Sequence, residues 1–323
     1  MREFRSRFAK DLDEMIAMLI VTGLKESSYL TRAKSFDKFC ADSKPECSEL
    51  TEALCLEWIQ PVMKESPQII HSRVCFLNGF AAYLRSVGKS ACTLHNKFTS
   101  GRSLFVPYLF TDEELARLFR AIDTDNSHKN TFQRILFSVY FRMVYTCGMR
   151  PNESRLLQKN HVDLKSGEIT ILCSKERKSR IVVMSDDMLQ LAKKYRLVLD
   201  LAFPDSEVFF PSIHGSISAA SFYQKHLVRF WASANSETPA DFLPRVRVYD
   251  LRHRFATATI HRWLDHKEDI SSKLPYLQMY MGHRNLSSTT YYVHLLPENL
   301  VKTAGIDWES LGTIFPGAEL WQG

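Results

Sequence analysis

The sequence predicts a mostly α-helical protein with one small β-hairpin, organised as a helical N-terminal domain followed by an α+β C-terminal domain. Three observations predict this fold. Apolar residues recur at helical spacing along most of the chain, only two short β-branched segments interrupt them, and a Ser-, Gly- and Pro-containing stretch separates the two parts. The chain has 323 residues, which at roughly 100–200 residues per domain indicates two or three domains.

The first part, residues 1–104, is expected to be a bundle of helices. Apolar residues recur at helical spacing, and no alternating strand pattern occurs there. Ser27 or Ser28 can cap the second helix, and Ser48 can start the third. The predicted helices lie at about residues 8–20, 28–39, 48–58 and 67–87.

A linker is expected at residues 99–108, where Ser, Gly and Pro break both helical and strand patterns. We therefore place the boundary near residue 104, with a second domain over residues 105–323. Thr111 and Glu114 have the spacing of a capping box, which predicts that a new helix begins there.

The second part is predicted to be helical around one β-hairpin. The segments 168–173 and 180–184 are short and β-branched, and the basic stretch 174–179 joins them as a charged tip. The remaining segments have helical patterns. These helices are expected at about residues 131–145, 185–199, 218–234, 249–266, 273–281 and 287–296.

Composition restricts the class of protein only loosely. Lys plus Arg number 42 and Asp plus Glu 36, a net charge of +6, which permits a nucleic-acid partner without requiring one. The seven cysteines are odd in number and form no CxxC pair, which favours a reducing compartment. The apolar run 15–21 is far shorter than the ~20 residues of a membrane span. We expect a cytoplasmic protein without a membrane partner.

Motifs for common cofactors and metals are absent from the sequence. There is no GxxxxGK[ST], no GxGxxG after a predicted strand and no HExxH. His261 and His266 are five residues apart, which is a poor spacing for two metal ligands on one helix face. We expect neither a cofactor nor a metal ion.

The remaining candidates for a functional site are basic residues and one tyrosine pair. Each of them alone is explained equally well as a solvated, capping or core residue. Their order is more informative. The segment 147–156 has the pattern G-[LM]-R-x-x-E-x-x-L, and 174–180 is a lysine-bearing hairpin tip. The segment 249–257 resembles H-x-L-R-H-[ST]-F-A-T, with Tyr at its first position and Arg at its sixth. The segment 277–294 contains Gly-His followed nine residues later by Tyr.

These four segments, within about residues 111–300, resemble the catalytic domain of the tyrosine recombinases, the phage integrase family. The resemblance implies that Arg150 and Arg252 clamp a phosphate, that Lys175 is the general acid, that His283 donates a further hydrogen bond and that Tyr292 is the nucleophile. The N-terminal part resembles the family's DNA-binding core-binding domain in position and helicity only.

Two other positions of these segments carry expectations. Tyr249 is a departure, because the family usually has His there and sometimes Lys. We include it in the catalytic set as a phosphate hydrogen-bonding residue, and its role as a base for the nucleophile stays open. Glu153, one turn after Arg150, is expected to orient an arginine or the active-site backbone.

The chemistry explains why such a site consists of Arg, Lys, His and Tyr. A phenolate that attacks phosphorus forms a phosphotyrosine ester and so conserves the energy of the broken bond. Guanidiniums can hold the non-bridging oxygens through paired hydrogen bonds and keep their charge. The leaving 5′ oxygen needs a proton, which a hairpin lysine can supply.

The predicted function is therefore a site-specific DNA recombinase or integrase, of a mobile element, that works through a 3′-phosphotyrosine intermediate. The alternatives are a type IB-like topoisomerase, a telomere resolvase, or a catalytically inactive DNA-binding architectural protein. Expected partners are double-stranded DNA, three further copies of the chain in a tetrameric synapse, and accessory DNA-bending proteins. Bound to DNA, the protein would be nucleoid-associated. The tail 297–323 packs on its own domain or docks as an exchange element into a neighbouring protomer.

Overall fold

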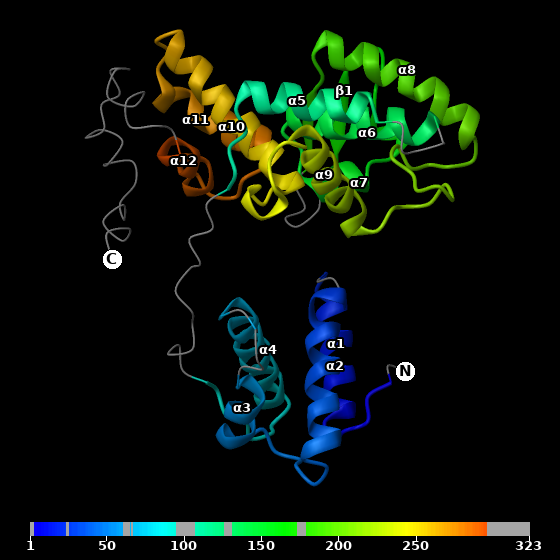
Figure 1. Cartoon of the computed structure of the whole chain (residues 1–323). Coiled ribbons are helices and arrows are strands. Elements are labelled where there is room, and N and C mark those ends of the chain that lie inside the picture. Colours follow the sequence, from blue (N-terminus) through cyan, green and yellow to red (C-terminus); the bar gives the residue numbers. More distant parts are fainter. Residues whose placement is uncertain are drawn as a thin grey trace. The chain divides into compact units, whose positions relative to one another are not determined.

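A computed structural model of the chain forms two compact units, Met1–Phe105 and Val106–Gly323 (Figure 1). The division lies beside the boundary expected near residue 104. Most of the expected linker, the hairpin tip and the C-terminal tail lie outside the described residues. The structure describes residues 3–23, 26–60, 65, 67–94, 107–125, 131–172 and 179–295.

The described residues of the first unit form four helices, as the apolar spacing predicted. They are α1 (Ala9–Val21), α2 (Glu26–Ser43), α3 (Glu52–Ile59) and α4 (Pro67–Ser86) (Figure 1, blue to cyan). Aromatic rings fill the space between them. The Phe36 ring is central, with ring-centroid distances of 5.6 Å to Phe8, 5.1 Å to Trp58 and 6.0 Å to Phe80. Edge and tilted contacts of this kind are the usual packing of buried aromatic rings.

Two helix starts differ from the prediction. Helix α3 begins at Glu52, and Thr51, not Ser48, is its cap, because the Thr51 hydroxyl accepts a hydrogen bond from the Leu54 backbone N–H at 3.3 Å. Leu50 forms an isolated β-bridge with Ala91, so the chain is extended immediately before this cap. Helix α2 already begins at residue 26, ahead of both serines at which its start was expected.

Unit 2 is helical around one antiparallel hairpin. Helix α6 (Thr131–Thr146) lies at its centre, packed against α5, α8 and α10. Phe137, Phe141 and Val144 of α6 are almost completely buried. The other helices are α5 (Asp112–Asp123), α7 (Pro151–Arg155), α8 (Asp186–Ala202), α9 (Ala220–Ala234), α10 (Val248–Asp265), α11 (Ile270–Met281) and α12 (Ser287–His294) (Figure 1).

The hairpin pairs β1 (Glu168–Ile171) with β2 (Arg180–Val183), in a register that sets Ile171 opposite Arg180. The mostly helical fold with a two-stranded sheet is thus confirmed. Helix ends shift by a few residues from their predicted positions; α11, for example, starts at residue 270 because the Asp269 carboxylate accepts from the Ser271 backbone N–H at 3.0 Å. Within the described ranges, no helix is long and apolar enough to cross a membrane.

The capping box of α5 is formed as predicted, and we expect it to contribute measurably to stability. The Thr111 hydroxyl accepts from the Glu114 N–H at 3.2 Å, and the Glu114 carboxylate accepts from the Thr111 N–H at 2.9 Å. Thr111→Ala should lower the free energy of unfolding by about 1 kcal/mol because it removes one cap acceptor. Urea unfolding measures this loss, with Thr111→Ser as the control that keeps the hydroxyl. Equal stabilities of the two variants would contradict the prediction.

Candidate active site

Arg252, on the second turn of α10, is fully buried, and its guanidinium joins three segments of unit 2. One terminal nitrogen, Nη1, donates to the Gly148 carbonyl at 2.6 Å, in the turn after α6. The other, Nη2, donates to the Met281 carbonyl at 2.6 Å, at the end of α11, and lies 3.0 Å from His283 Nε2. Burial lowers the pKa of Arg252 from its usual value.

The groups that bind this guanidinium are all neutral. They are two carbonyls and an imidazole, and among the described residues Arg252 Nε has no hydrogen-bond partner. A buried charge without an opposite charge in contact with it is costly. The arrangement therefore favours an anion such as a phosphate diester, whose charge would balance that of Arg252.

Arg150 reaches the same region from the turn between α6 and α7. Its Nη2 donates to the Gly282 carbonyl, which directly follows the Met281 carbonyl bound by Arg252. The turn needs glycine at position 148, where φ is +59° and an added Cβ would lie 2.4 Å from the Phe255 ring. Two consecutive carbonyls at the end of α11 thus hold the two guanidiniums close together.

Glu153 orients both Arg150 and the base of the hairpin. Its carboxylate accepts from Arg150 Nη1 at 2.7 Å and from Arg180 at 2.9 and 2.6 Å. Arg180 Nε also donates to the Tyr280 carbonyl at 2.8 Å. Burial opposes ionisation of Glu153, but the bonds from Arg180 and Arg150 prevail and hold its pKa at about 2. These contacts agree with the orienting role expected of Glu153.

His283, in the turn after α11, bonds to groups on both sides of its ring. Since an arginine can only donate, His283 Nε2 accepts from Arg252, and Nδ1–H donates to the Thr289 hydroxyl at 2.8 Å. Burial, followed by the charges of Arg252 and Arg150, lowers the pKa of His283 to about 3, which leaves the ring neutral. In this resting arrangement Nε2 is an acceptor, so donation to a phosphate requires His283 to gain a proton there.

Tyr292 lies at the centre of this cluster, and its neighbour Tyr291 does not share its burial. Tyr292 is 2 % exposed, and its ring centroid is 5.9 Å from that of His283. Burial raises the pKa of the Tyr292 phenol to about 12. Its hydroxyl oxygen lies 3.1 Å from His253 Nδ1. Tyr249 stands one turn earlier on α10, with its ring centroid 5.0 Å from that of His253.

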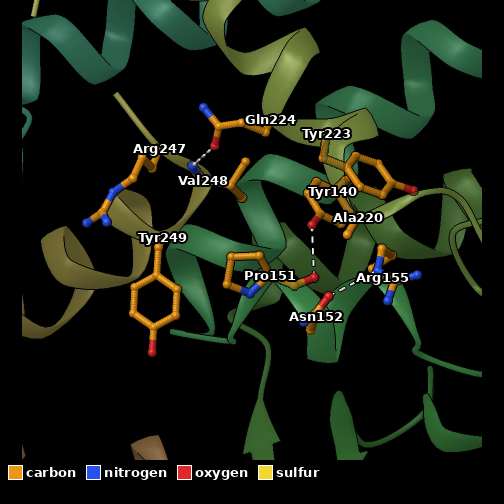
Figure 2. Close-up of a pocket in the computed structure, with 10 residues that line it drawn as sticks. All are labelled: Tyr140, Pro151, Asn152, Arg155, Ala220, Tyr223, Gln224, Arg247, Val248 and Tyr249. Atoms are coloured by element: carbon orange, nitrogen blue, oxygen red, sulfur yellow. Dashed lines mark hydrogen bonds between the residues drawn. The ribbon is translucent and has the colours of Figure 1, made fainter. Parts of the chain in front are cut away.

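Tyr249 also borders a pocket of about 190 Å³ between α6, α7, α9 and the start of α10 (Figure 2). The stacked rings of Tyr140 and Tyr223, 3.5 Å apart, line the opposite side. Figure 2 shows the Tyr249 hydroxyl pointing away from this pair. Arg155, another lining residue, donates to Asn152 Oδ1 at 3.1 Å and to the Ser218 carbonyl at 2.8 Å.

The structure thus brings five of the six predicted catalytic residues into one neighbourhood. Lys175, the sixth, lies outside the described residues, as does the rest of the hairpin tip. Sequence reasoning missed His253 and Arg180, although both stand inside the motif segments. In the sequence, only their positions could have indicated them. His253 directly follows Arg252, and Arg180 is the first residue of β2. Residues 109–299 match the phage integrase family.

The chain belongs to the phage integrase family. The resemblance carried by the four motif segments is therefore confirmed, and the family is one of enzymes, the tyrosine recombinases. The family match covers the cluster around Arg252 and none of the first unit. In the described residues, no group of three or more His, Cys, Asp or Glu side chains is arranged to hold a metal ion.

Two curated relatives of this chain have names that describe an integrase or recombinase. The candidate integrase/recombinase y4rE of Sinorhizobium fredii is 28% identical over 198 residues, which cover 61% of this chain and 62% of y4rE, less than two thirds of its length. The candidate integrase/recombinase y4rB of the same organism is 26% identical over 267 residues, covering 79% of this chain and 82% of y4rB.

Solved structures with the same fold contain DNA. XerH recombinase in a post-cleavage complex with its difH substrate has a TM-score of 0.63 at 20% identity, covering 88% of this chain and 80% of XerH. The Tn1549 transposon integrase in complex with transposon right end DNA has a TM-score of 0.63 at 15% identity, covering 90% of this chain and 97% of that integrase. A λ integrase tetramer bound to a Holliday junction has a TM-score of 0.56 at 12% identity, covering 85% of this chain and 77% of the λ integrase chain. At such identities these likenesses show the fold alone.

The Glu153 carboxylate should stabilise this integrase-family domain in a pH-dependent way. Glu153→Gln should lower the free energy of unfolding near neutral pH by on the order of 3 kcal/mol, because it leaves Arg150 and Arg180 without their shared anion. Folding lowers the pKa of Glu153 from 4.5 to about 2. The ionised group therefore stabilises the folded state fully above about pH 4.5, and this contribution is lost as the pH falls toward about 2.

Urea unfolding of the wild type and of Glu153→Gln at a series of pH values tests this prediction. The difference in the free energy of unfolding between the two proteins, called the stability gap, should narrow as the pH falls below about 5. The exposed Glu237, changed to Gln, serves as the matched control and should show no such gap. A gap that stayed constant down to about pH 3 would contradict the assigned role of Glu153.

Proposed function

We propose that this chain is a site-specific recombinase that cuts and rejoins duplex DNA through a 3′-phosphotyrosine intermediate, without metal or ATP. One observation carries the proposal. Among the described residues, the buried Arg252 guanidinium has only neutral hydrogen-bond partners, and it lies in one cluster with a second arginine and a buried tyrosine. A phosphodiester supplies both the missing negative charge and an atom for a tyrosine to attack.

Each predicted catalytic residue has a task in this reaction. The Tyr292 oxygen attacks phosphorus, while Arg150 and Arg252 stabilise the charge that gathers on the non-bridging oxygens. Preorganised donors of this kind contribute about 2.7–4 kcal/mol each to transition-state stabilisation. Lys175 delivers a proton to the leaving 5′ oxygen. Tyr249, at the edge of the cluster, is placed to donate a hydrogen bond to a phosphate oxygen.

The site must open before it can react. Arg252 is 0 % and Tyr292 2 % exposed in the unbound chain, so a phosphate cannot reach either group without a rearrangement. Helix α12, which carries Tyr292, has eight residues and packs on α10 and α11. We expect a shift of this short helix to expose Tyr292 to a phosphate. Binding of DNA would supply the free energy for that shift.

The wider function is proposed on the same basis. The first unit, with the boundary near residue 104, would bind DNA together with the catalytic unit, and four copies would assemble around two recombination sites. The λ integrase tetramer on a Holliday junction supports this assembly. The Tn1549 transposon integrase supports an origin in a mobile element. The tail 297–323, outside the described residues, would dock into a neighbouring protomer as an exchange element.

Tyr292, not Tyr291, should form the covalent bond to DNA. Adjacent residues on a helix point about 100° apart, so only one of the two can face the arginines. Tyr292→Phe should abolish the protein–DNA adduct, and Tyr291→Phe should retain it. A binding site is first selected from random duplex DNA, and a nicked form of that site then traps the adduct for gel analysis.

The same assay separates the proposed function from an inactive architectural role. An architectural protein would bind the selected site with no adduct in the wild type. A type IB-like topoisomerase would relax supercoiled plasmids lacking that site. An adduct that survives in Tyr292→Phe would sink the assignment of the nucleophile.

Lys175, rather than Lys178, should protonate the leaving group. A 5′-phosphorothiolate at the cleaved bond has a sulfur leaving group that needs no proton. This substrate should restore adduct formation to Lys175→Ala but not to Arg252→Ala, which lacks a phosphate clamp. Lys178→Ala is the matched control on the same hairpin tip, and rescue of Lys178→Ala instead would reverse the two roles.

A further inference from the structure

The hydroxyl of Tyr292 has a partner that the motif comparison did not supply. Its oxygen lies 3.1 Å from Nδ1 of His253, on α10. The two rings are tilted by 53°, with centroids 5.5 Å apart, so the contact is made through the hydroxyl and not by ring stacking. His253 directly follows Arg252, so the helix that holds the clamp also holds this imidazole.

His253 is in the protonation state that accepts a hydrogen bond. Burial, followed by the charges of Arg247 and Arg252, lowers the pKa of His253 to about 4, so the ring is neutral near neutral pH. With its hydrogen on Nε2, the neutral ring presents a lone pair at Nδ1. The Tyr292 phenol, whose pKa is raised by burial, keeps its proton in the resting state and donates it in this hydrogen bond.

Position 249 offers no comparable acceptor. Residues 249 and 253 are one turn apart on the same face of α10. Tyr249 has a phenol, which offers no nitrogen lone pair. The imidazole nitrogen within hydrogen-bonding distance of the Tyr292 hydroxyl is His253 Nδ1. The other imidazole near Tyr292, that of His283, has Nε2 occupied by Arg252 and Nδ1 by Thr289.

We propose that His253 accepts the proton of Tyr292 during DNA cleavage, a task one helical turn away from the position where the motif has its histidine. The inference rests on the proposed function. As the Tyr292 oxygen forms its bond to phosphorus, its O–H bond breaks and the proton moves to His253 Nδ1. The P–O5′ bond breaks, its electron pair stays on O5′, and Lys175 protonates that oxygen. Rejoining reverses each transfer.

Proton transfer has to accompany bond formation, because the phenol is a far weaker acid than the imidazolium. Esterification to phosphorus makes the tyrosine oxygen strongly acidic, so the proton leaves as the P–O bond grows. The scissile phosphate also brings negative charge next to His253, which favours its imidazolium form. General base catalysis of this kind typically contributes about 10²–10⁴-fold to the rate.

The rate of adduct formation on the nicked site tests the proposal with two substitutions. His253→Asn keeps an acceptor near Nδ1 but cannot take up a proton, and His253→Ala removes the group. Both should slow adduct formation by about 10²-fold or more while DNA affinity changes little. Added imidazole should restore His253→Ala at least tenfold, and an equal concentration of sodium chloride should not. His261→Asn, on the same helix and outside the cluster, is the matched control.

Each other outcome has a definite meaning. Wild-type rates in both variants, or no rescue by imidazole, would overturn the proposal. Full activity in His253→Asn alone would overturn the proton transfer and show that His253 only positions Tyr292. Faster adduct formation in either variant would also overturn it and show that the contact inhibits Tyr292. Absence of an adduct in the wild type would instead overturn the proposed function, and this inference with it. Thermal melts of the variants exclude misfolding as the cause of a slow rate.

Nuclear magnetic resonance supplies a readout that does not depend on activity. In the full-length chain without DNA, the ¹⁵N shift of His253 Nδ1 should be that of an unprotonated nitrogen accepting a hydrogen bond. Tyr292→Phe should shift it toward the value of a free imidazole, and Tyr291→Phe should leave it unchanged. A protonated Nδ1 in the wild type would contradict the geometry on which the proposal rests.

Discussion

Burial of the Arg252 guanidinium is the constraint on which the rest of this structure depends. Its hydrogen bonds reach Gly148, 104 residues away, and Met281, 29 residues away, so one side chain holds the end of α6, α10 and the end of α11 together. Burying a charge among neutral hydrogen-bond partners is costly, and these long-range hydrogen bonds offset part of that cost.

A second set of contacts, made by ion pairs around Glu153, supports the hydrogen bonds of Arg252. Glu153 lies between Arg150 and Arg180 and ties α7 to β2, while Arg180 extends the link to the Tyr280 carbonyl. The hairpin base and the first clamp arginine thus depend on the same carboxylate. A rigid base is what a hairpin needs if its tip is to bring a proton donor to a fixed phosphate, since small misplacements of a catalytic group are costly.

Tyr292, the proposed nucleophile, belongs to a short helix of the site. Helix α12 has eight residues and packs on α10 and α11. Burial of Tyr292 among His253, His283 and Arg252 raises the pKa of its phenol and keeps it away from solvent. Thr289, Tyr292 and Val293 anchor this helix in unit 2, and each is at most 3 % exposed.

The sequence by itself determined the elements and the family. Helical spacing, the Thr111 capping box and the β-branched segments around the basic tip predicted the helices and the hairpin, and four short motifs identified the two arginines, His283 and Tyr292. It misplaced helix starts such as that of α3, where a bridge from Leu50 to Ala91 decides the boundary. Only the tertiary structure decided which groups meet. The contacts of His253 with Tyr292 and of Arg180 with Glu153 join segments 39 and 27 residues apart, and a local pattern carries no information about such pairs.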